Sequence, residues 1–189
     1  MCGRFLISLL AIFNIYTLIF SEEVKEKEIS INGYYIREFS KETAVGLRAK
    51  ALGDFYFNKG KYTKAIHFYE NAIKYLPNEA DLYFNLGNIY ASQKVYSLAI
   101  HYFKVASEKY TLPENYGKTQ KNFYLSLIRY AFSLEKMKDV MDNHSKAKEV
   151  VVKINSYLDE INEKFPEIKP ELEKLYLLMY GTTTVIPFK

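Results

Sequence analysis

Histidine and cysteine are the residue types that most often carry nucleophilic or metal chemistry, and this 189-residue sequence has three histidines and one cysteine. His67 and His101 stand 34 positions apart in the same local sequence pattern. On successive packed helices, equivalent residues are separated by about 8–10 Å. A metal ion with bonds of about 2 Å cannot join them. We therefore expect both to pack at a partly exposed surface.

The remaining reactive residue types are equally isolated. His144 stands in a polar segment near Asp142, where we expect it to be solvated. Cys2 precedes an apolar run, whereas a lipoprotein cysteine would directly follow it. The sequence shows no Ser/His/Asp or Cys/His constellation, no set of metal ligands and no Gly-rich phosphate loop. We expect no enzyme, no metal and no cofactor.

A repeat of 34 residues is the strongest pattern in the sequence. Residues of the same type recur at this spacing, and Tyr69 returns as another aromatic residue, Phe103. A fixed period of about 34 residues is typical of a helix–turn–helix solenoid. The recurring pairs are Leu52/Leu86, Gly53/Gly87, Tyr56/Tyr90, Tyr62/Tyr96, Ala65/Ala99, Ile66/Ile100 and Ala72/Ala106.

Helices must position these residues. We expect them at about 41–58, 62–75, 79–92 and 96–110, with Ser40 as an N-cap and prolines after the second and fourth helices. Gly53 and Gly87 would permit close helix contact, while Leu52 and Tyr56 would lie on a buried stripe. Small residues would leave room on the opposing helices: Ala65, Ala72, Ala99 and Ala106.

These residues resemble the tetratricopeptide repeat family, whose pattern is W-x2-L-G-x2-Y, then A-x3-F, then P. The resemblance covers residues 46–113. It implies an all-α, short helix–turn–helix solenoid that binds proteins and generally performs no catalysis. The first copy has Ala49, Leu52, Gly53, Tyr56, Ala65, Tyr69 and Pro77 at the pattern positions; the second has Tyr83, Leu86, Gly87, Tyr90, Ala99, Phe103 and Pro113.

A third helix pair and a last helix follow the two clear repeats. Two apolar stripes indicate the divergent pair, and a shorter stripe ending at Gly181 indicates a capping helix. The stripes are Phe123, Leu127, Tyr130 and Leu134; Ala147, Val151, Ile154, Leu158 and Ile161; and Leu172, Leu175, Tyr176 and Met179. The predicted organisation is 1–21 export segment, 22–40 linker, 41–113 two repeats, 114–165 divergent pair, and 166–189 capping helix and tail.

The N-terminal segment indicates export. Phe5–Phe20 is a mostly apolar run that follows Arg4 and precedes the small residue Ser21. It fits a cleaved signal peptide or an uncleaved membrane anchor through residues 5–20; a buried helix is the third alternative. The first two place the chain outside the cytoplasm, either in the periplasm or anchored and facing the non-cytoplasmic side. In the linker, Asn32-Gly33 between apolar residues is a hairpin signal with very short flanks.

Charge and composition exclude other classes. The net charge of +4 is spread along the chain without a clustered basic face, so we expect no nucleic-acid partner. Hydrophobic residues at 49% exclude a disordered chain. The expected partner is another protein or a peptide.

The family resemblance places the binding surface on one stripe of each first helix, lining a concave groove. There, Phe57 and Phe84 are expected to be exposed anchors for a partner. The predicted groove residues are Leu47, Lys50, Asp54, Phe57, Asn58, Asp81, Phe84, Asn85 and Asn88.

One subclass of the family holds a peptide's C-terminal carboxylate with Lys and Asn side chains. Lys50 and Asn85 match that clamp, and Lys121 is a candidate for another basic group. Asp54 replaces an expected Asn and would repel a carboxylate. The leading hypothesis is therefore a non-catalytic scaffold of the cell envelope that holds a peptide or partner helix. The alternative is a self-associating structural protein whose groove is filled by its own chain or another copy.

Overall fold

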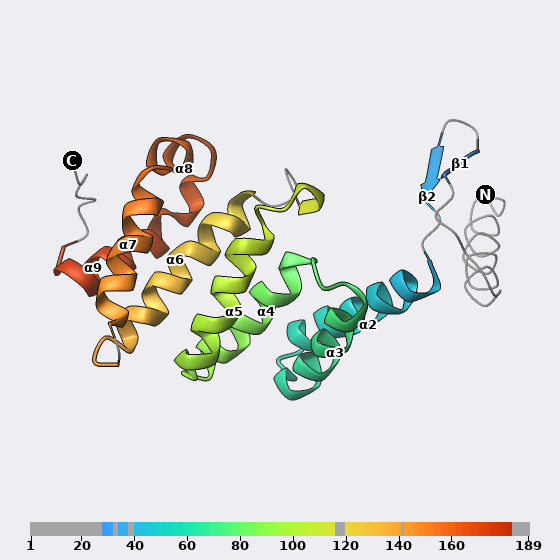
Figure 1. Cartoon of the computed structure of the whole chain (residues 1–189), viewed down its shortest axis with the longest axis horizontal. Coiled ribbons are helices and arrows are strands. Elements are labelled where there is room, and N and C mark those ends of the chain that lie inside the picture. Colours follow the sequence, from blue (N-terminus) through green and yellow to red (C-terminus); the bar gives the residue numbers. More distant parts are fainter. Residues whose placement is uncertain (1–27, 32–33, 38–39, 116–119, 141, 183–189) are drawn as a thin grey trace, which may run out of the picture. The chain divides into compact units, whose positions relative to one another are not determined.

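The computed structural model describes residues 28–31, 34–37, 40–115, 120–140 and 142–182 (Figure 1). The predicted export segment and the end of the tail lie outside the described residues. The chain divides into two compact units, Met1–Pro77 and Asn78–Lys189, and each is described by itself.

Among its described residues, the first unit has a short strand pair and one helix pair. Strands β1 (Glu28–Ile31) and β2 (Tyr34–Arg37) are antiparallel, as the Asn32-Gly33 signal indicates, with Ile31 opposite Tyr34. Helices α2 (Lys41–Asn58) and α3 (Tyr62–Tyr75) have the predicted bounds.

Local interactions fix where these two helices begin and end. The Ser40 Oγ accepts a hydrogen bond of 3.1 Å from the backbone N–H of Thr43, which caps α2 as predicted. Gly60, between the two helices, has φ +68°, a backbone conformation that side chains disfavour. Pro77 follows α3 and cannot continue it.

The α2–α3 contact depends on a missing side chain. A Cβ atom added to Gly53 would lie 2.5 Å from Cδ1 of Tyr69, so the Tyr69 ring occupies the space that any side chain would need. Ala65 and Ala72 on α3 are fully buried. The predicted role of the glycine and alanines is confirmed. The predicted burial of Leu52 is wrong, because its side chain is 38% exposed.

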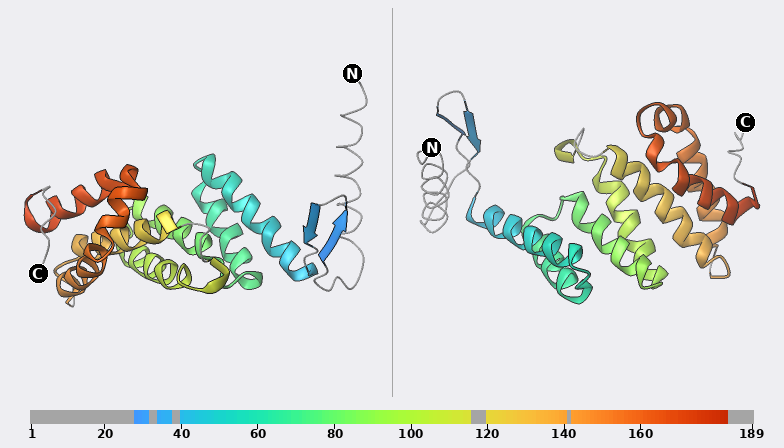
Figure 2. Two further views of the ribbon diagram at one scale, coloured as in Figure 1. Left: turned by 90° about the horizontal axis from the view of Figure 1, so that it is seen from above. Right: turned by 180° about the vertical axis from the view of Figure 1, so that it is seen from behind.

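The described residues of the second unit form six α-helices and two 3₁₀ turns. Helix α6 lies between α5 and α7 (Figure 2). The elements are α4 (Ala80–Ser92), α5 (Tyr96–Lys109), the 3₁₀ turn η1 (Pro113–Asn115), α6 (Gln120–Lys136), α7 (Asn143–Asn155), α8 (Leu158–Lys164), the 3₁₀ turn η2 (Pro166–Ile168) and α9 (Lys169–Tyr180).

The second repeat packs as the first does. A Cβ atom added to Gly87 would lie 2.7 Å from Cδ1 of Phe103, and Ala99 and Ala106 are fully buried. A contiguous apolar core continues from α4 and α5 through α6 and α7 to α9. The described part of the chain is therefore an all-α helical-repeat fold preceded by one short strand pair.

The divergent third pair is present with one difference from the prediction. The single helix expected to run from Ala147 to Ile161 is divided into α7 and α8, because the chain turns at Ser156 and Tyr157. There the Tyr157 N–H bonds to the carbonyl of Ile154 at 2.9 Å instead of continuing the α-helical pattern. Helix α9 then packs against α6 and ends at Gly181, whose φ is +72°.

Candidate functional site

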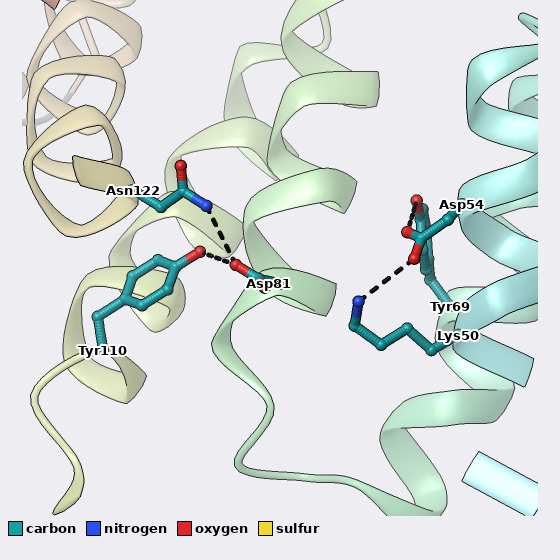
Figure 3. A network of polar contacts seen from close by, with 6 residues as sticks. All are labelled: Lys50, Asp54, Tyr69, Asp81, Tyr110 and Asn122. Atoms are coloured by element: carbon teal, nitrogen blue, oxygen red, sulfur yellow. Dashed lines mark hydrogen bonds and ion pairs between the residues drawn. The ribbon is translucent and has the colours of Figure 1, made fainter. Parts of the chain in front are cut away.

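In the first unit, the predicted groove stripe on α2 contains an internal charge pair. Nζ of Lys50 lies 3.3 Å from Oδ2 of Asp54, and the Tyr69 hydroxyl donates to Oδ1 of Asp54 at 2.8 Å (Figure 3). Asp54 is therefore held from its own helix and from α3. A partner approaching this stripe meets a neutralised pair, so Lys50 presents less positive charge than the sequence suggested.

The other stripe residues of α2 differ in exposure. The Phe57 ring is half-buried and its centroid lies 5.9 Å from that of Tyr62. Leu47 is also half-buried, while Asn58 is exposed at the end of the helix. Phe57 thus offers one face of its ring as contact area.

In the second unit, two groups of polar side chains join neighbouring helices, and we call them junctions. Asp81 is at the centre of the first. Its Oδ1 accepts a hydrogen bond from the Tyr110 hydroxyl at 2.5 Å and from Nδ2 of Asn122 at 3.2 Å (Figure 3). Burial raises the pKa of Tyr110, and the charge of Asp81 raises it further, so the hydroxyl stays protonated and donates. Asp81 therefore fixes α4 to the end of α5 and to the start of α6.

Phe84 is not the exposed anchor that the sequence predicted. Its side chain is 7% exposed, and its ring centroid lies 6.0 Å from that of Phe103 and 6.3 Å from that of Tyr110. The Arg129 guanidinium carbon lies 5.1 Å from the Phe84 ring centroid. The prediction failed because α6 follows α4 closely enough for Arg129 and the core to cover this position.

Asn88 belongs to the second junction. Its Oδ1 accepts a hydrogen bond of 2.5 Å from Nη1 of Arg129 on α6. The same guanidinium donates from Nε to Oε2 of Glu171 on α9 at 2.8 Å and from Nη2 to Oε1 at 2.6 Å. A planar guanidinium matches a carboxylate in this two-bond arrangement. Asn85, the remaining predicted residue on α4, is half-buried.

Four residues of these junctions escaped the sequence prediction: Asn122, Tyr110, Arg129 and Glu171. A signal existed only for Arg129, because arginine is scarce in this lysine-rich sequence and suits bidentate contacts better than lysine. The others required knowledge of which helices are adjacent.

Lys121 does not supply the basic group suggested for a carboxylate clamp. Its Nζ lies 2.9 Å from Oε1 of Glu167, so its charge is already paired. Together with the Lys50–Asp54 pair, this contact disfavours the clamp.

The histidines have local partners. His67 contacts Asn71 at 3.2 Å, and the His101 ring meets the Tyr102 ring edge-on. His144 is not simply solvated, because its Nδ1 lies 2.7 Å from Oε2 of the buried Glu135. Across the described residues, no group of three or more His, Cys, Asp or Glu side chains could hold a metal ion.

Comparisons with known proteins agree with this geometry. Residues 53–94 match the sequence model described as TPR repeat. Two solved structures share the fold: the TPR2B domain of yeast Sti1 in complex with pHsp70 (23% identity, TM-score 0.56) and the N-terminal domain of stress-induced protein-1 (STI-1) from C. elegans (20% identity, TM-score 0.55). The matches cover 73% and 74% of this chain and 98% of each of those chains. No curated protein sequence matches.

The likeness to these two structures shows the class of fold, an all-α helical-repeat solenoid. More particularly, residues 53–94 are similar to a TPR repeat, and they are followed by a divergent third helix pair and by α9, which packs on α6.

Proposed function

We propose that this protein is an exported, non-catalytic scaffold of the cell envelope that holds a peptide or partner helix against the first helices of its repeats. The observation that carries this proposal is the row of partly exposed polar side chains where α4 and α6 meet. The row consists of Asp81, Asn88, Asn122 and Arg129.

The chemistry of this row suits a main-chain ligand. Asparagine amides both donate and accept hydrogen bonds, so Asn88 and Asn122 can satisfy peptide N–H and C=O groups in a partner. Their present partners are neighbouring side chains, which can share or exchange bonds when a ligand arrives. In the first unit, taken by itself, the half-buried Phe57 on α2 offers apolar contact area to a partner.

Groove variants test the binding proposal. Asn88→Ala and Asn85→Ala in the full-length chain should weaken capture of partners from native membranes, measured by quantitative mass spectrometry, at least about tenfold. The matched control is Val152→Ala on α7, where the side chain is exposed. Full capture by folded groove variants, with loss in the α7 variant, would place the binding surface elsewhere.

The proposed location rests on the sequence of residues 1–21. An apolar run after Arg4 and before Ser21 supports export. Among the described residues, no helix is long and apolar enough to cross a membrane. A reporter fused to the C-terminus should be active only on the non-cytoplasmic side. Activity in the cytoplasm would refute export, and N-terminal sequencing of the exported chain would distinguish a cleaved signal from an anchor.

A second candidate function is self-association, with the binding face filled by the protein's own chain. The packing of α9 on α6 favours it, because Glu171 already occupies the guanidinium of Arg129. Light scattering tests the form of self-association that uses another copy: a concentration-independent monomer argues against it.

A further inference from the structure

An exposed stripe runs along α2 on a different face from the predicted groove residues. Three apolar side chains lie on it: Val45 is 43% exposed, Leu52 is 38% exposed and Phe55 is 54% exposed. Their spacing of seven and three residues matches the apolar seam of a helix that pairs with another helix. The groove residues Lys50 and Asp54 lie on a different side of the same helix.

The same positions are closed in the second repeat. Leu86 and Ile89 stand 34 residues after Leu52 and Phe55, and both have no exposed surface. Leu82, the equivalent of Arg48, is also fully buried. These positions of α4 therefore form a packing surface. In α2 the equivalent positions are exposed.

The second unit shows what kind of element covers a first helix. There α5, the second helix of one repeat, packs along α6, the first helix of the next. In the described part of the chain α2 is the first helix, so no described repeat precedes it. A helix is therefore the kind of element that we expect to cover the open face of α2.

Charge restricts what that helix can be. Lys41, Arg48 and Lys59 continue the stripe at the same heptad spacing, and all three are exposed. None of them forms an ion pair with another described residue. A second copy of α2 would bring like charges together, since Lys41 would oppose Lys59 in an antiparallel pair and Lys41 in a parallel pair.

We propose that the Val45–Leu52–Phe55 face of α2 is a second docking surface, which receives an amphipathic helix of a partner protein with an apolar stripe flanked by Asp or Glu. The acidic flanks would lie beside Lys41, Arg48 and Lys59, while the apolar stripe covers the three exposed apolar side chains. This surface is separate from the groove of the proposed function, and either could exist without the other.

A synthetic helix provides the probe. A fluorescently labelled peptide of about 20 residues, with Leu at heptad positions a and d and Glu at e and g, has the required pattern, and its Glu side chains disfavour pairing with itself. Binding to the full-length chain is measured by anisotropy. A peptide with Lys at e and g is the charge control and should bind at least about tenfold more weakly.

Variants of the protein locate the binding. Leu52→Glu and Arg48→Glu change exposed side chains of α2 and should each weaken binding of the Glu peptide at least about tenfold, with unchanged circular dichroism. The matched control is Leu177→Glu on α9, where the leucine is also exposed. It should bind as the parent does, and so should Asn88→Ala in the groove.

Five outcomes would overturn the proposal. The first is unchanged affinity of the two α2 variants, and the second is equal binding of the Glu and Lys peptides. The third is a dimer of the full-length chain that Phe55→Ser dissociates, which would make a second copy the occupant. The fourth is photocross-linking from position 55 to residues 1–27 of the same chain, and the fifth is binding to phosphatidylserine vesicles that Leu52→Glu abolishes.

Discussion

Arg129 on α6 and Glu171 on α9 form a two-bond ion pair, with nitrogen–oxygen distances of 2.6 Å and 2.8 Å. Because the same guanidinium also bonds to Asn88 and lies over the Phe84 ring, one arginine joins α4, α6 and α9. Helix α9 therefore packs on α6 and is also linked, through the hydrogen bonds of Arg129, to α4 of the second repeat.

We predict a measurable coupling between Arg129 and Glu171. In a double-mutant cycle with Arg129→Ala and Glu171→Ala, the coupling free energy of unfolding should be about 1 kcal/mol, because both side chains are partly screened by solvent. Hydrogen exchange in α9 should become faster in both single variants. The exposed Lys104–Glu108 pair, at 4.0 Å, is the control and should couple by less than about 0.5 kcal/mol. Equal coupling in both cycles would contradict the role given to Arg129.

Substitution of the buried helix glycine Gly53 should destabilise the first unit. Gly53→Leu forces a side chain into the Tyr69 ring, and overpacking of this kind costs about 1–3 kcal/mol or more of unfolding free energy. Urea unfolding followed by circular dichroism measures the loss. Ala51→Leu, at an exposed position of the same helix, should change stability by less than about 0.5 kcal/mol. An unchanged midpoint for Gly53→Leu would refute the close approach of α2 and α3.

Phe84→Ala should behave as a core variant. Removing a buried phenylalanine leaves a cavity and costs about 3–5 kcal/mol of unfolding free energy. Phe55→Ala, on the exposed face of α2, is the matched control and should cost less than about 1 kcal/mol. If the two variants unfold at the same urea concentration, Phe84 is not buried in solution.

Acid should weaken the contact between α6 and α8. The Tyr124 hydroxyl donates to Glu160 at 2.6 Å, and this bond, with a further one from Lys164, holds the pKa of Glu160 below its ordinary value. A carboxyl whose pKa is depressed by folding contributes stability above its unfolded pKa and loses it as the pH falls through the folded pKa. The unfolding free energy should therefore decrease as the pH falls below about 4.5.

Tyr124→Phe tests this assignment. NMR titration should show a higher pKa for Glu160 in the variant, because the strongest donor to its carboxylate is gone. Glu167, whose pKa is lowered by the hydrogen bond from Lys121, is an internal control and should titrate as before. If the pKa of Glu160 is the same in the variant, the Tyr124 hydroxyl is not what lowers it.

The helix pairs could be predicted because their signals are local. Ser40, Gly60 and Pro77 act on the backbone near their own positions, so the bounds of α2 and α3 followed from the sequence. The 34-residue spacing of Gly53 and Gly87 identified the close helix contacts, since in each repeat the glycine lies against an aromatic ring of the second helix.

Side-chain exposure on those helices depended on neighbours far along the sequence. Leu52 and Leu86 occupy the same repeat position, yet one is exposed and the other buried. Phe84 was expected to be exposed because the family resemblance places its stripe in the binding groove, but Arg129 and the core close over it. The sequence alone determined the repeat, the helices and the packing of small residues, because these depend on periodicity and local backbone chemistry. Only the tertiary structure decided which stripes remain open, because burial is set by whichever helix the chain brings alongside.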